Sequence, residues 1–364
     1  MQYFFLSIFL AFGLSCEGQN FTLNDFQSAN SELDAQVDSI FSRLSDHDRV
    51  SQLIMPAAGR LGSPADTVKA LVQQKKIGGI ILLNGTKTQF SNWTKEYNTL
   101  CKASGGLPFL YSADAEPSLV NRKMIGSRTV PKANAIKTLE QLNQTATTIS
   151  EDLNSVGVNY NFAPVVDVAK NSTVGYRGFG SNPENIIPYS NAFIQITQEH
   201  NIVATAKHFP GHGLVSGDTH KSLQVIDGEL KELKYYPPLI ESGVLSIMIA
   251  HIAIKNNDEF NTDGLPATLS KVVVTDLLRD SLGFEGLIVT DAMNMGGVVN
   301  VENCYVKAID AGCDILLMPK SSFIAHAELL KKYREAQDFQ EKVNEACKRI
   351  IRMKICLGLM DTSN

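Results

Sequence analysis

Eight strand-length segments of mostly apolar residues recur along this chain of 364 residues, and helical patterns separate most of them. Segments that are apolar almost without interruption are expected to be buried on both faces, as in a parallel sheet covered by helices. This alternation predicts an α/β fold, and eight such strands can close into a (β/α)8 TIM barrel that forms a single catalytic domain. We expect strands near residues 53–57, 79–83, 109–113, 159–166, 202–206, 246–251, 286–290 and 314–318, with the clearest helices at 64–76, 139–156, 183–200, 229–242, 271–282 and 301–311.

An open, doubly wound sheet is the alternative arrangement of such elements. The residues at the end of the first predicted strand read Met55-Pro-Ala-Ala-Gly-Arg, which is not a glycine-rich phosphate-binding loop. This absence favours the barrel. Before that strand, apolar residues from Leu33 to Leu44 recur at helical spacing, and Ser45 is expected to cap a second short helix.

The N-terminal segment has the pattern of an export signal. Its first 15 residues are mostly apolar and too few to span a bilayer as a helix, and polar sequence follows Cys16. We expect a signal over residues 1–16, a linker over 17–30 and the catalytic domain over 31–360. Leu14-Ser15-Cys16 resembles a bacterial lipoprotein signal, with plain secretory cleavage as the alternative. The protein is therefore expected to be exported, either periplasmic or attached to a membrane through lipidated Cys16.

Composition narrows the partners and cofactors. The formal net charge is -5, and without a run of Lys or Arg there is no basic surface to attract nucleic acid. The cysteines after Cys16 lack CxxC spacing, so neither a disulfide scaffold nor a metal centre is expected, and no cofactor is implied. Composition does not indicate an oligomeric state.

The predicted strands deliver ionisable residues to one end of the sheet. In a barrel the carboxyl ends of the strands carry the chemistry. Capping of the next helix explains a single strand-end carboxylate, but several unpaired charges in one concavity are costly without a ligand. The residues at these ends are Asp114 and Glu116, Asp167, Lys207 and His208, His251, and Asp291.

The loop after the fifth predicted strand reads KHFPGHGLVSGDTH and holds three of the seven histidines. In an extended backbone, residues two apart project to the same side, so Asp218 and His220 are expected to form a hydrogen-bonded pair. Local turn preferences of Asp, Gly and His are the alternative explanation. The glycines at 211, 213 and 217 are expected to let this loop close over a ligand.

The motifs KHFPGHG, Asp-Thr-His and Ile-Val-Thr-Asp-Ala-Met together resemble glycoside hydrolase family 3, and more narrowly its single-domain β-N-acetylglucosaminidases. The resemblance implies a carbohydrate substrate, Asp291 as nucleophile, and His220 with Asp218 as the acid/base pair. It assigns sugar binding to Asp114, Arg122, Arg177, Lys207 and His208. One departure is Pro117-Ser118, which stands where the family often has Gly-Gly and leaves the details of the sugar subsite open.

A retaining glycosidase needs a carboxylate that attacks the anomeric carbon and an acid that protonates the leaving oxygen. An imidazole suits the second role because its ordinary pKa is about 6.5. The resemblance thus implies an exo-acting β-N-acetylglucosaminidase that hydrolyses terminal β-linked N-acetylhexosamine from glycan or peptidoglycan fragments. Lys207 is expected to help keep Asp291 ionised.

Four other functions remain open. They are a β-glucosidase, a β-N-acetylglucosaminide phosphorylase, a catalytically inactive sugar-binding lipoprotein and a TIM-barrel metal hydrolase. The last is disfavoured because the first strand ends in Pro56-Ala-Ala-Gly rather than in a pair of histidines.

Overall fold

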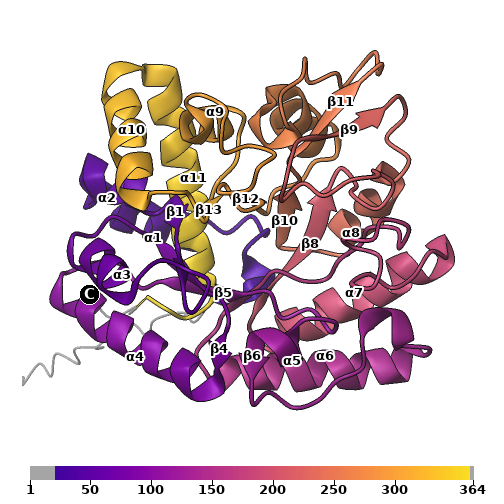
Figure 1. The fold of residues 1–364 in the computed structure, drawn as a ribbon. Coiled ribbons are helices and arrows are strands. Elements are labelled where there is room, and N and C mark those ends of the chain that lie inside the picture. The colour runs from indigo at the N-terminus through magenta and orange to yellow at the C-terminus, as the bar shows by residue number, and fades with distance from the viewer. Residues whose placement is uncertain (1–20, 361–364) are drawn as a thin grey trace, which may run out of the picture.

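The computed structural model describes residues 21–360. Its centre is a curled sheet of seven parallel strands that hydrogen-bond in the order β12-β10-β8-β7-β5-β3-β2 (Figure 1). The order follows the chain without reversal, unlike that of a doubly wound sheet. The strands are β2 (Ala57–Ala58), β3 (Gly79–Leu82), β5 (Leu110–Ala113), β7 (Tyr160–Asn161), β8 (Val203–Phe209), β10 (Ser246–Ile249) and β12 (Leu287–Thr290).

A separate parallel pair joins β1 (Ile54–Met55) with β13 (Leu316–Leu317). Backbone contacts reach from this pair toward both edges of the larger sheet. Val289 forms an isolated parallel bridge with Ile315, and Gly78 N–H donates to the carbonyl of Ile54 at 3.1 Å. Every predicted strand segment contains a strand, so the α/β, TIM-like arrangement is confirmed.

Helices surround the strands (Figure 1). The predicted cap is present, since the Ser45 side chain accepts the backbone N–H of Asp48 at 3.2 Å. The α-helices are α1 (Ser31–Ser42), α2 (Asp46–Ser51), α3 (Ala65–Gln73), α4 (Lys87–Ala103), α5 (Val120–Lys123), α6 (Leu139–Asn154), α7 (Pro183–Glu199), α8 (Tyr236–Glu241), α9 (Cys304–Asp310), α10 (Ser322–Glu335) and α11 (Gln337–Cys356).

Shorter elements complete the described chain. Two small parallel ribbons pair β4 (Gly85–Thr86) with β6 (Met124–Ile125), and β9 (Gln224–Asp227) with β11 (Ile252–Lys255). The π-helical segment η5 (Val272–Ser281) occupies the helix predicted at 271–282. The 3-10 turns are η1 (Leu23–Asp25), η2 (Ala133–Ala135), η3 (Leu233–Tyr235) and η4 (Ala267–Leu269).

Three long helices, α4, α10 and α11, are not among the predicted ones. In α4 the buried positions are Phe90, Thr94, Tyr97 and Cys101, a helical spacing in which only Phe90 has a purely hydrocarbon side chain. A buried face with so few hydrocarbon side chains gives only a weak apolar pattern in the sequence, although it packs well against the sheet in the folded protein.

The segment predicted as a linker, residues 17–30, packs onto the domain in its described part. Phe21, Leu23 and Phe26 are buried in the main hydrophobic core. Arg352 in α11 fixes the turn because its guanidinium donates to the carbonyls of Phe26 and Ser28, each at 2.6 Å. Burial of these apolar side chains and the hydrogen bonds from Arg352 hold the segment on the domain. Residues 21–30 therefore pack onto the domain and do not form the predicted linker. The predicted signal over residues 1–16, with Cys16, lies outside the described residues.

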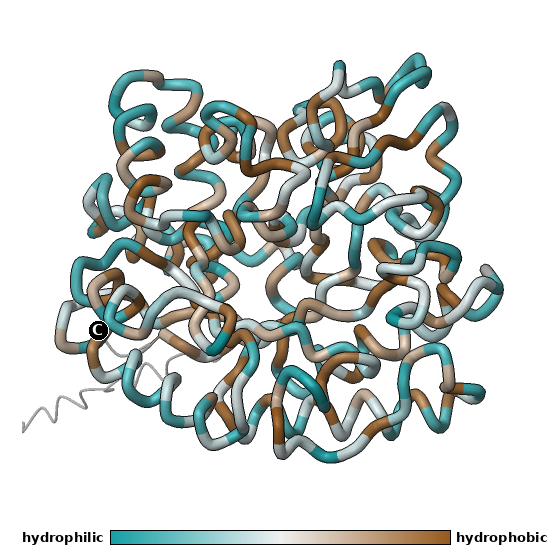
Figure 2. Tube along the Cα trace, viewed as in Figure 1, coloured by the Kyte–Doolittle hydropathy of each residue, from teal (hydrophilic) through white to brown (hydrophobic). Residues whose placement is uncertain are grey.

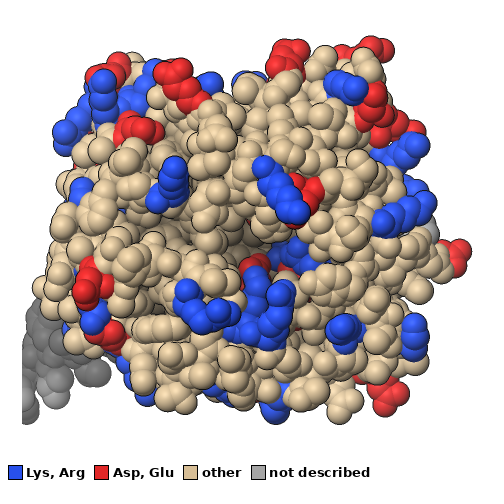
Figure 3. Space-filling view, in the orientation of Figure 1, with Lys and Arg blue, Asp and Glu red and all other residues tan. Residues whose placement is uncertain are grey.

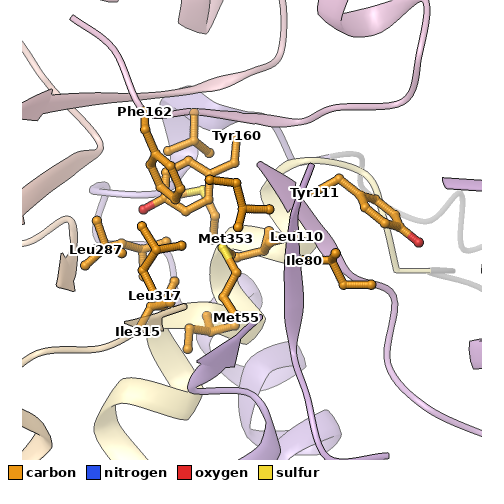
Figure 4. Packing of buried hydrophobic residues seen from close by; sticks show 14 of the residues in the cluster. Met55, Ile80, Leu110, Tyr111, Tyr160, Phe162, Leu287, Ile315, Leu317 and Met353 are labelled. Atoms are coloured by element: carbon orange, nitrogen blue, oxygen red, sulfur yellow. The ribbon is translucent and has the colours of Figure 1, made fainter. Parts of the chain in front are cut away.

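The hydrophobic core lies inside the ring of helices. Apolar segments concentrate in the interior and polar ones on the outer helix faces (Figure 2). Met55 of β1, Tyr160 of β7 and Leu317 of β13 pack with Phe162, which follows β7, and with Met353 of α11 in the core cluster (Figure 4). Full burial of such side chains contributes about 1.5–3 kcal/mol each. Within residues 21–360, no helix is both long enough and apolar enough to cross a membrane.

Candidate active site

A cavity of about 630 Å³ opens at the carboxyl ends of the parallel strands. It is visible as a hollow near the centre of the face in Figure 3, with acidic and basic side chains at its base. Strand ends of barrel folds carry ligand sites because each strand delivers one or two side chains to the same mouth. All eight predicted site residues line this cavity: Asp114, Arg122, Arg177, Lys207, His208, Asp218, His220 and Asp291.

A buried ion-pair network forms one wall. Lys207 in β8 is 1% exposed, and its Nζ lies 3.0 Å from Asp114 Oδ1 and 2.6 Å from Glu116 Oε1. Arg177 holds the same glutamate through two hydrogen bonds, from Nε at 2.9 Å and from a terminal nitrogen at 2.6 Å. Lys123 pairs with the other oxygen of Asp114. Each buried charge therefore has an opposite partner, which is the condition for keeping such charges in a protein interior.

The network keeps its members charged. Burial acts to raise the pKa of Asp114, but Lys123 and Lys207 outweigh it and hold that pKa well below its ordinary value. Burial opposes ionisation of Glu116 too, and the charges of Arg177 and Lys207 lower its pKa to about 2. The pKa of Lys207 is raised, because the two carboxylates overcome the effect of burial. The wall thus presents fixed donors and acceptors to the cavity near neutral pH.

Asp291 follows β12 directly and is not a helix cap, since the next helix, α9, begins at Cys304. One carboxylate oxygen accepts the N–H of Ala292 at 2.7 Å. Burial tends to raise the pKa of Asp291, but the charges of His208 and His251 and the Ala292 hydrogen bond lower it below its ordinary value. The charge of His208 and the Ala292 hydrogen bond thus favour the ionised form of Asp291, and the contribution expected from Lys207 stays a prediction.

Asp167 orients His208 beside the cavity. Its carboxylate accepts His208 Nδ1 at 2.6 Å and the backbone N–H of His212 at 2.8 Å. The pKa of Asp167 is lowered, because its hydrogen bonds and the charge of His208 outweigh burial. Since Nδ1 donates to the carboxylate, the other ring nitrogen of His208 is left for a ligand.

His251 is fixed on both ring nitrogens. Nε2 donates to the carbonyl of Ala292 at 3.0 Å, and Nδ1 contacts the Thr268 hydroxyl at 2.7 Å. Burial lowers the pKa of His251. This imidazole holds the backbone that follows Asp291.

Asp218 and His220 form the predicted pair. His220 Nδ1 lies 2.7 Å from Asp218 Oδ1, and the same oxygen accepts the backbone N–H of His220 at 3.0 Å. The backbone is not extended, however. The Asp218 carbonyl accepts the N–H groups of Lys221 and Ser222, so a turn brings the two side chains together. Burial acts to raise the pKa of Asp218, and the hydrogen bonds from His220 lower it.

The sequence pattern did not assign roles to some residues of the site. Glu116 and Asp167 were recognised only as strand-end carboxylates, yet they anchor Lys207, Arg177 and His208. Lys123 was missed; it pairs with Asp114, whereas its neighbour Arg122 lines the cavity from an exposed position.

The substitution at Pro117-Ser118 acquires a definite contact in the structure. The Ser118 hydroxyl donates to the carbonyl of Tyr176 at 2.6 Å and accepts the N–H of Ala133 at 2.9 Å. Ser118 therefore ties the segment after β5 to the backbone that precedes Arg177. Within residues 21–360, no group of three or more His, Cys, Asp or Glu side chains is arranged to hold a metal ion.

Comparison with known proteins places this arrangement in a family. Residues 46–353 match the glycosyl hydrolase family 3 N-terminal domain. The chain is 28% identical over 294 residues to a β-N-acetylglucosaminidase/β-glucosidase of Cellulomonas fimi, which covers 73% of this chain and 52% of that protein. It thus spans about half the length of the first curated relatives it matches.

Solved structures of similar proteins also include members of this family. A glycoside hydrolase family 3 β-N-acetylglucosaminidase from Paenibacillus sp. FPU-7 aligns with a TM-score of 0.80 at 28% identity, covering 87% of this chain and 63% of that one. The β-glucoside phosphorylase BglX bound to 2FGlc aligns with a TM-score of 0.81 at 25% identity, covering 91% and 62%. Because the family match extends over most of the sequence and includes the strands that build the cavity, the chain belongs to glycoside hydrolase family 3.

Proposed function

We propose that this protein is a retaining, exo-acting β-N-acetylglucosaminidase that releases terminal β-linked N-acetylhexosamine from glycan or peptidoglycan fragments. The observation that carries the proposal is the convergence of Asp291 and the hydrogen-bonded Asp218–His220 pair on one cavity. A carboxylate kept ionised and an imidazole oriented by a second carboxylate are the groups that double displacement at an anomeric carbon requires.

The reaction takes two balanced steps. In the first, an Asp291 oxygen bonds to the anomeric carbon as the glycosidic C–O bond breaks, and the proton of His220 passes to the leaving oxygen. In the second, water attacks the anomeric carbon, His220 takes a proton from that water, and the bond to Asp291 breaks. Asp218 stabilises the imidazolium and keeps the ring oriented. His220 is close enough to Asp291 for its charge to lower the pKa of that carboxyl.

The ion-pair wall suits the sugar. Asp114, Arg177, Lys207 and His208 present both donors and acceptors to the cavity, which matches the paired donor and acceptor character of sugar hydroxyls. Lys207 pairs with Asp114, Arg177 with Glu116 and His208 with Asp167, and these contacts hold the groups in place before substrate arrives, so little ordering cost remains for binding. Arg122, exposed at the cavity, is a further sugar-binding candidate.

The proposal extends to the architecture and location. The β1–β13 pair, hydrogen-bonded toward both edges of the seven-stranded sheet, supports closure into a (β/α)8 barrel within one domain over residues 31–360. The apolar N-terminal pattern ending at Cys16 supports export, to the periplasm or to a membrane through a lipid on Cys16.

A phosphorylase is the second candidate, because the chain resembles the β-glucoside phosphorylase BglX as well as β-N-acetylglucosaminidases. Phosphate would replace water in the second step. A β-glucosidase is also compatible with the Cellulomonas fimi relative, whose name includes both activities. An inactive sugar-binding protein would not need Asp291 and the Asp218–His220 pair on the same cavity.

Initial rates on an aryl β-N-acetylglucosaminide and the matching aryl β-glucoside, each with and without phosphate, separate these activities. Two polar contacts to the acetamido group that glucose leaves unmade would give a preference on the order of a hundredfold in kcat/KM. We expect such a preference, with turnover independent of phosphate. Equal kcat/KM values would leave a general β-glycosidase, and strict dependence on phosphate would identify a phosphorylase.

A further inference from the structure

Glu232 is a buried carboxylate next to the active-site loop that the proposed chemistry does not use. It is 4% exposed, precedes η3 and is not among the residues that line the cavity. One carboxylate oxygen accepts the backbone N–H of Val168 at 2.7 Å, and the other accepts that of Leu214 at 3.1 Å. A single side chain thus joins the segment after β7 to the beginning of the loop that carries Asp218 and His220.

The glycines of the loop fit around this carboxylate. A Cβ atom at Gly211 would lie 2.5 Å from Glu232 Cβ, and one at Gly213 would lie 2.6 Å from Glu232 Oε1 and 2.1 Å from the Val168 carbonyl oxygen. Any larger residue would collide with Glu232 or with the Val168 backbone. A Cβ atom at Gly217 would likewise lie 2.0 Å from the side-chain oxygen of Gln224. Close packing therefore accounts for glycine at 211 and 213, and the φ of +136° at Gly211 also requires the backbone freedom of glycine.

Further hydrogen bonds fasten the rest of the loop. Asn171 Nδ2 donates to the carbonyls of Val215 at 2.5 Å and Gly217 at 3.0 Å. His212 Nε2 lies 2.9 Å from the hydroxyl of Thr219, the residue between the two members of the pair. A displacement of the loop at Leu214 would therefore also shift the Asp218–His220 pair.

The tip of the loop rests on the segment that follows Asp291. The N–H groups of Gly297 and Gly296 donate to the carbonyls of Thr219 and His220 at 3.1 and 3.0 Å. The pair is thus held between two supports, one at Glu232 and one at Gly296 and Gly297 in the segment that follows the candidate nucleophile.

We propose that Glu232 is a positioning residue, which clamps the loop so that the Asp218–His220 pair keeps its alignment with Asp291. This inference rests on the proposed function. The carboxyl is strongly perturbed: burial and the neighbouring charge of Asp167 raise the pKa of Glu232 to about 8, against the opposing hydrogen bonds of the backbone N–H groups. Such a group beside an active site is commonly under functional constraint.

The test replaces Glu232 with Gln and uses Glu229→Gln as the matched control. Glu229 is exposed and lies three residues away, so the control makes the same chemical change outside the clamp. An amide keeps the shape of the carboxylate, but its NH2 group cannot accept one of the two backbone N–H groups. Kinetics are measured on an alkyl β-N-acetylglucosaminide, which needs an acid, and on a dinitrophenyl one, which does not. Amide hydrogen exchange at Leu214 is followed in parallel.

For Glu232→Gln we expect kcat on the alkyl glycoside to fall roughly 10- to 100-fold, as misplacement of a catalytic group by about 1 Å does. The rate of the first step on the dinitrophenyl glycoside should change less than threefold, with faster exchange at Leu214 and no effect in the control. A general structural defect would lower both rates together, and that result, or unchanged rates on both substrates, would overturn the proposal.

Glu232→Asp provides a second variant where Glu232→Gln does not fold. Its shorter side chain keeps the carboxyl group but withdraws an oxygen from one donor, so the same pattern of losses is expected. If the unmodified protein and Glu229→Gln turn over neither glycoside, the proposed function fails. Faster exchange at Leu214 in the Glu232 variants would then still support the clamp itself, and unchanged exchange would contradict it.

Discussion

His220 Nδ1 hydrogen-bonds to Asp218 Oδ1 at 2.7 Å, although 60% of the His220 side chain is exposed. Because the pKa of Asp218 is lowered, the carboxylate accepts and the ring must donate from Nδ1. The other ring nitrogen is then the one available to a glycosidic oxygen. The orientation of this exposed imidazole therefore depends on a single neighbour in the turn.

Replacement of His220 by Ala should affect substrates according to their leaving groups. An alkyl glycoside needs protonation of its oxygen, so its kcat/KM should fall about 10²- to 10⁴-fold. A dinitrophenyl glycoside leaves without help, so the first step should change little. Asp218→Asn should produce a milder form of the same pattern. Equal losses on both substrates would mean that His220 positions the sugar and transfers no proton.

Replacement of Glu116 by Gln should destabilise the protein. Glu116 is fully buried and is shared by Arg177 and Lys207, so its loss leaves cationic charge in the interior with too few partners. Breaking a buried pair in this way costs about 3–5 kcal/mol in the free energy of unfolding. Urea unfolding at neutral pH measures this difference.

Glu151→Gln is the control for that experiment. Glu151 pairs with Arg128 at 2.8 Å, but both side chains are about half exposed. A solvent-exposed pair contributes about 0–1 kcal/mol, so this variant should unfold nearly as the unmodified protein does. If Glu116→Gln lost as little free energy of unfolding as Glu151→Gln, the ion-pair wall would not depend on Glu116.

The strands and the ends of the strands were predictable because burial on two faces leaves a continuous apolar run, and the first polar residue after it marks the mouth of the sheet. That rule found Asp114, Lys207 and Asp291. It could not pair them, since Lys207 and Asp114 are 93 positions apart in the sequence and their contact depends on the register of neighbouring strands.

The spacing of Asp218 and His220 correctly predicted that their side chains meet, but the backbone between them forms a turn and not the predicted extended segment. Residues two apart meet in a turn as well as in an extended chain, so spacing alone does not distinguish the two. The glycines of the same loop have two physical explanations, freedom of the backbone and lack of a side chain. The second applies at Gly213 and both apply at Gly211, whose φ is +136°; the close packing became visible only with the position of Glu232.

His326 should make the fold sensitive to acid. Its Nε2 donates to the carbonyl of His47 at 3.2 Å, and Nδ1 faces the ammonium of Lys76 at 3.5 Å, so the ring is held neutral. Burial lowers the pKa of His326 to about 4 from an ordinary 6.5. The unfolded chain binds a proton between these values that the folded one does not, so stability is lost as pH falls from about 6.5 toward 4.

Unfolding by urea at pH 7 and pH 4.5 tests this, with His326→Gln as the comparison. Gln keeps a donor for the His47 carbonyl and cannot be protonated in this range. The variant should therefore lose less free energy of unfolding between the two pH values than the unmodified protein. Identical losses would place the acid sensitivity at other groups.

The most direct test of the account is the mass of the His220→Ala protein after mixing with a dinitrophenyl β-N-acetylglucosaminide. Without the base that activates water, the second step should become slow while the first proceeds, so a glycosyl-enzyme should accumulate. We predict a mass increase of one N-acetylglucosaminyl group, located on Asp291 by peptide mapping and absent from the His220→Ala/Asp291→Asn double variant. A covalent sugar on any other residue, or release of the phenol with no covalent enzyme and with inverted sugar as product, would contradict the account.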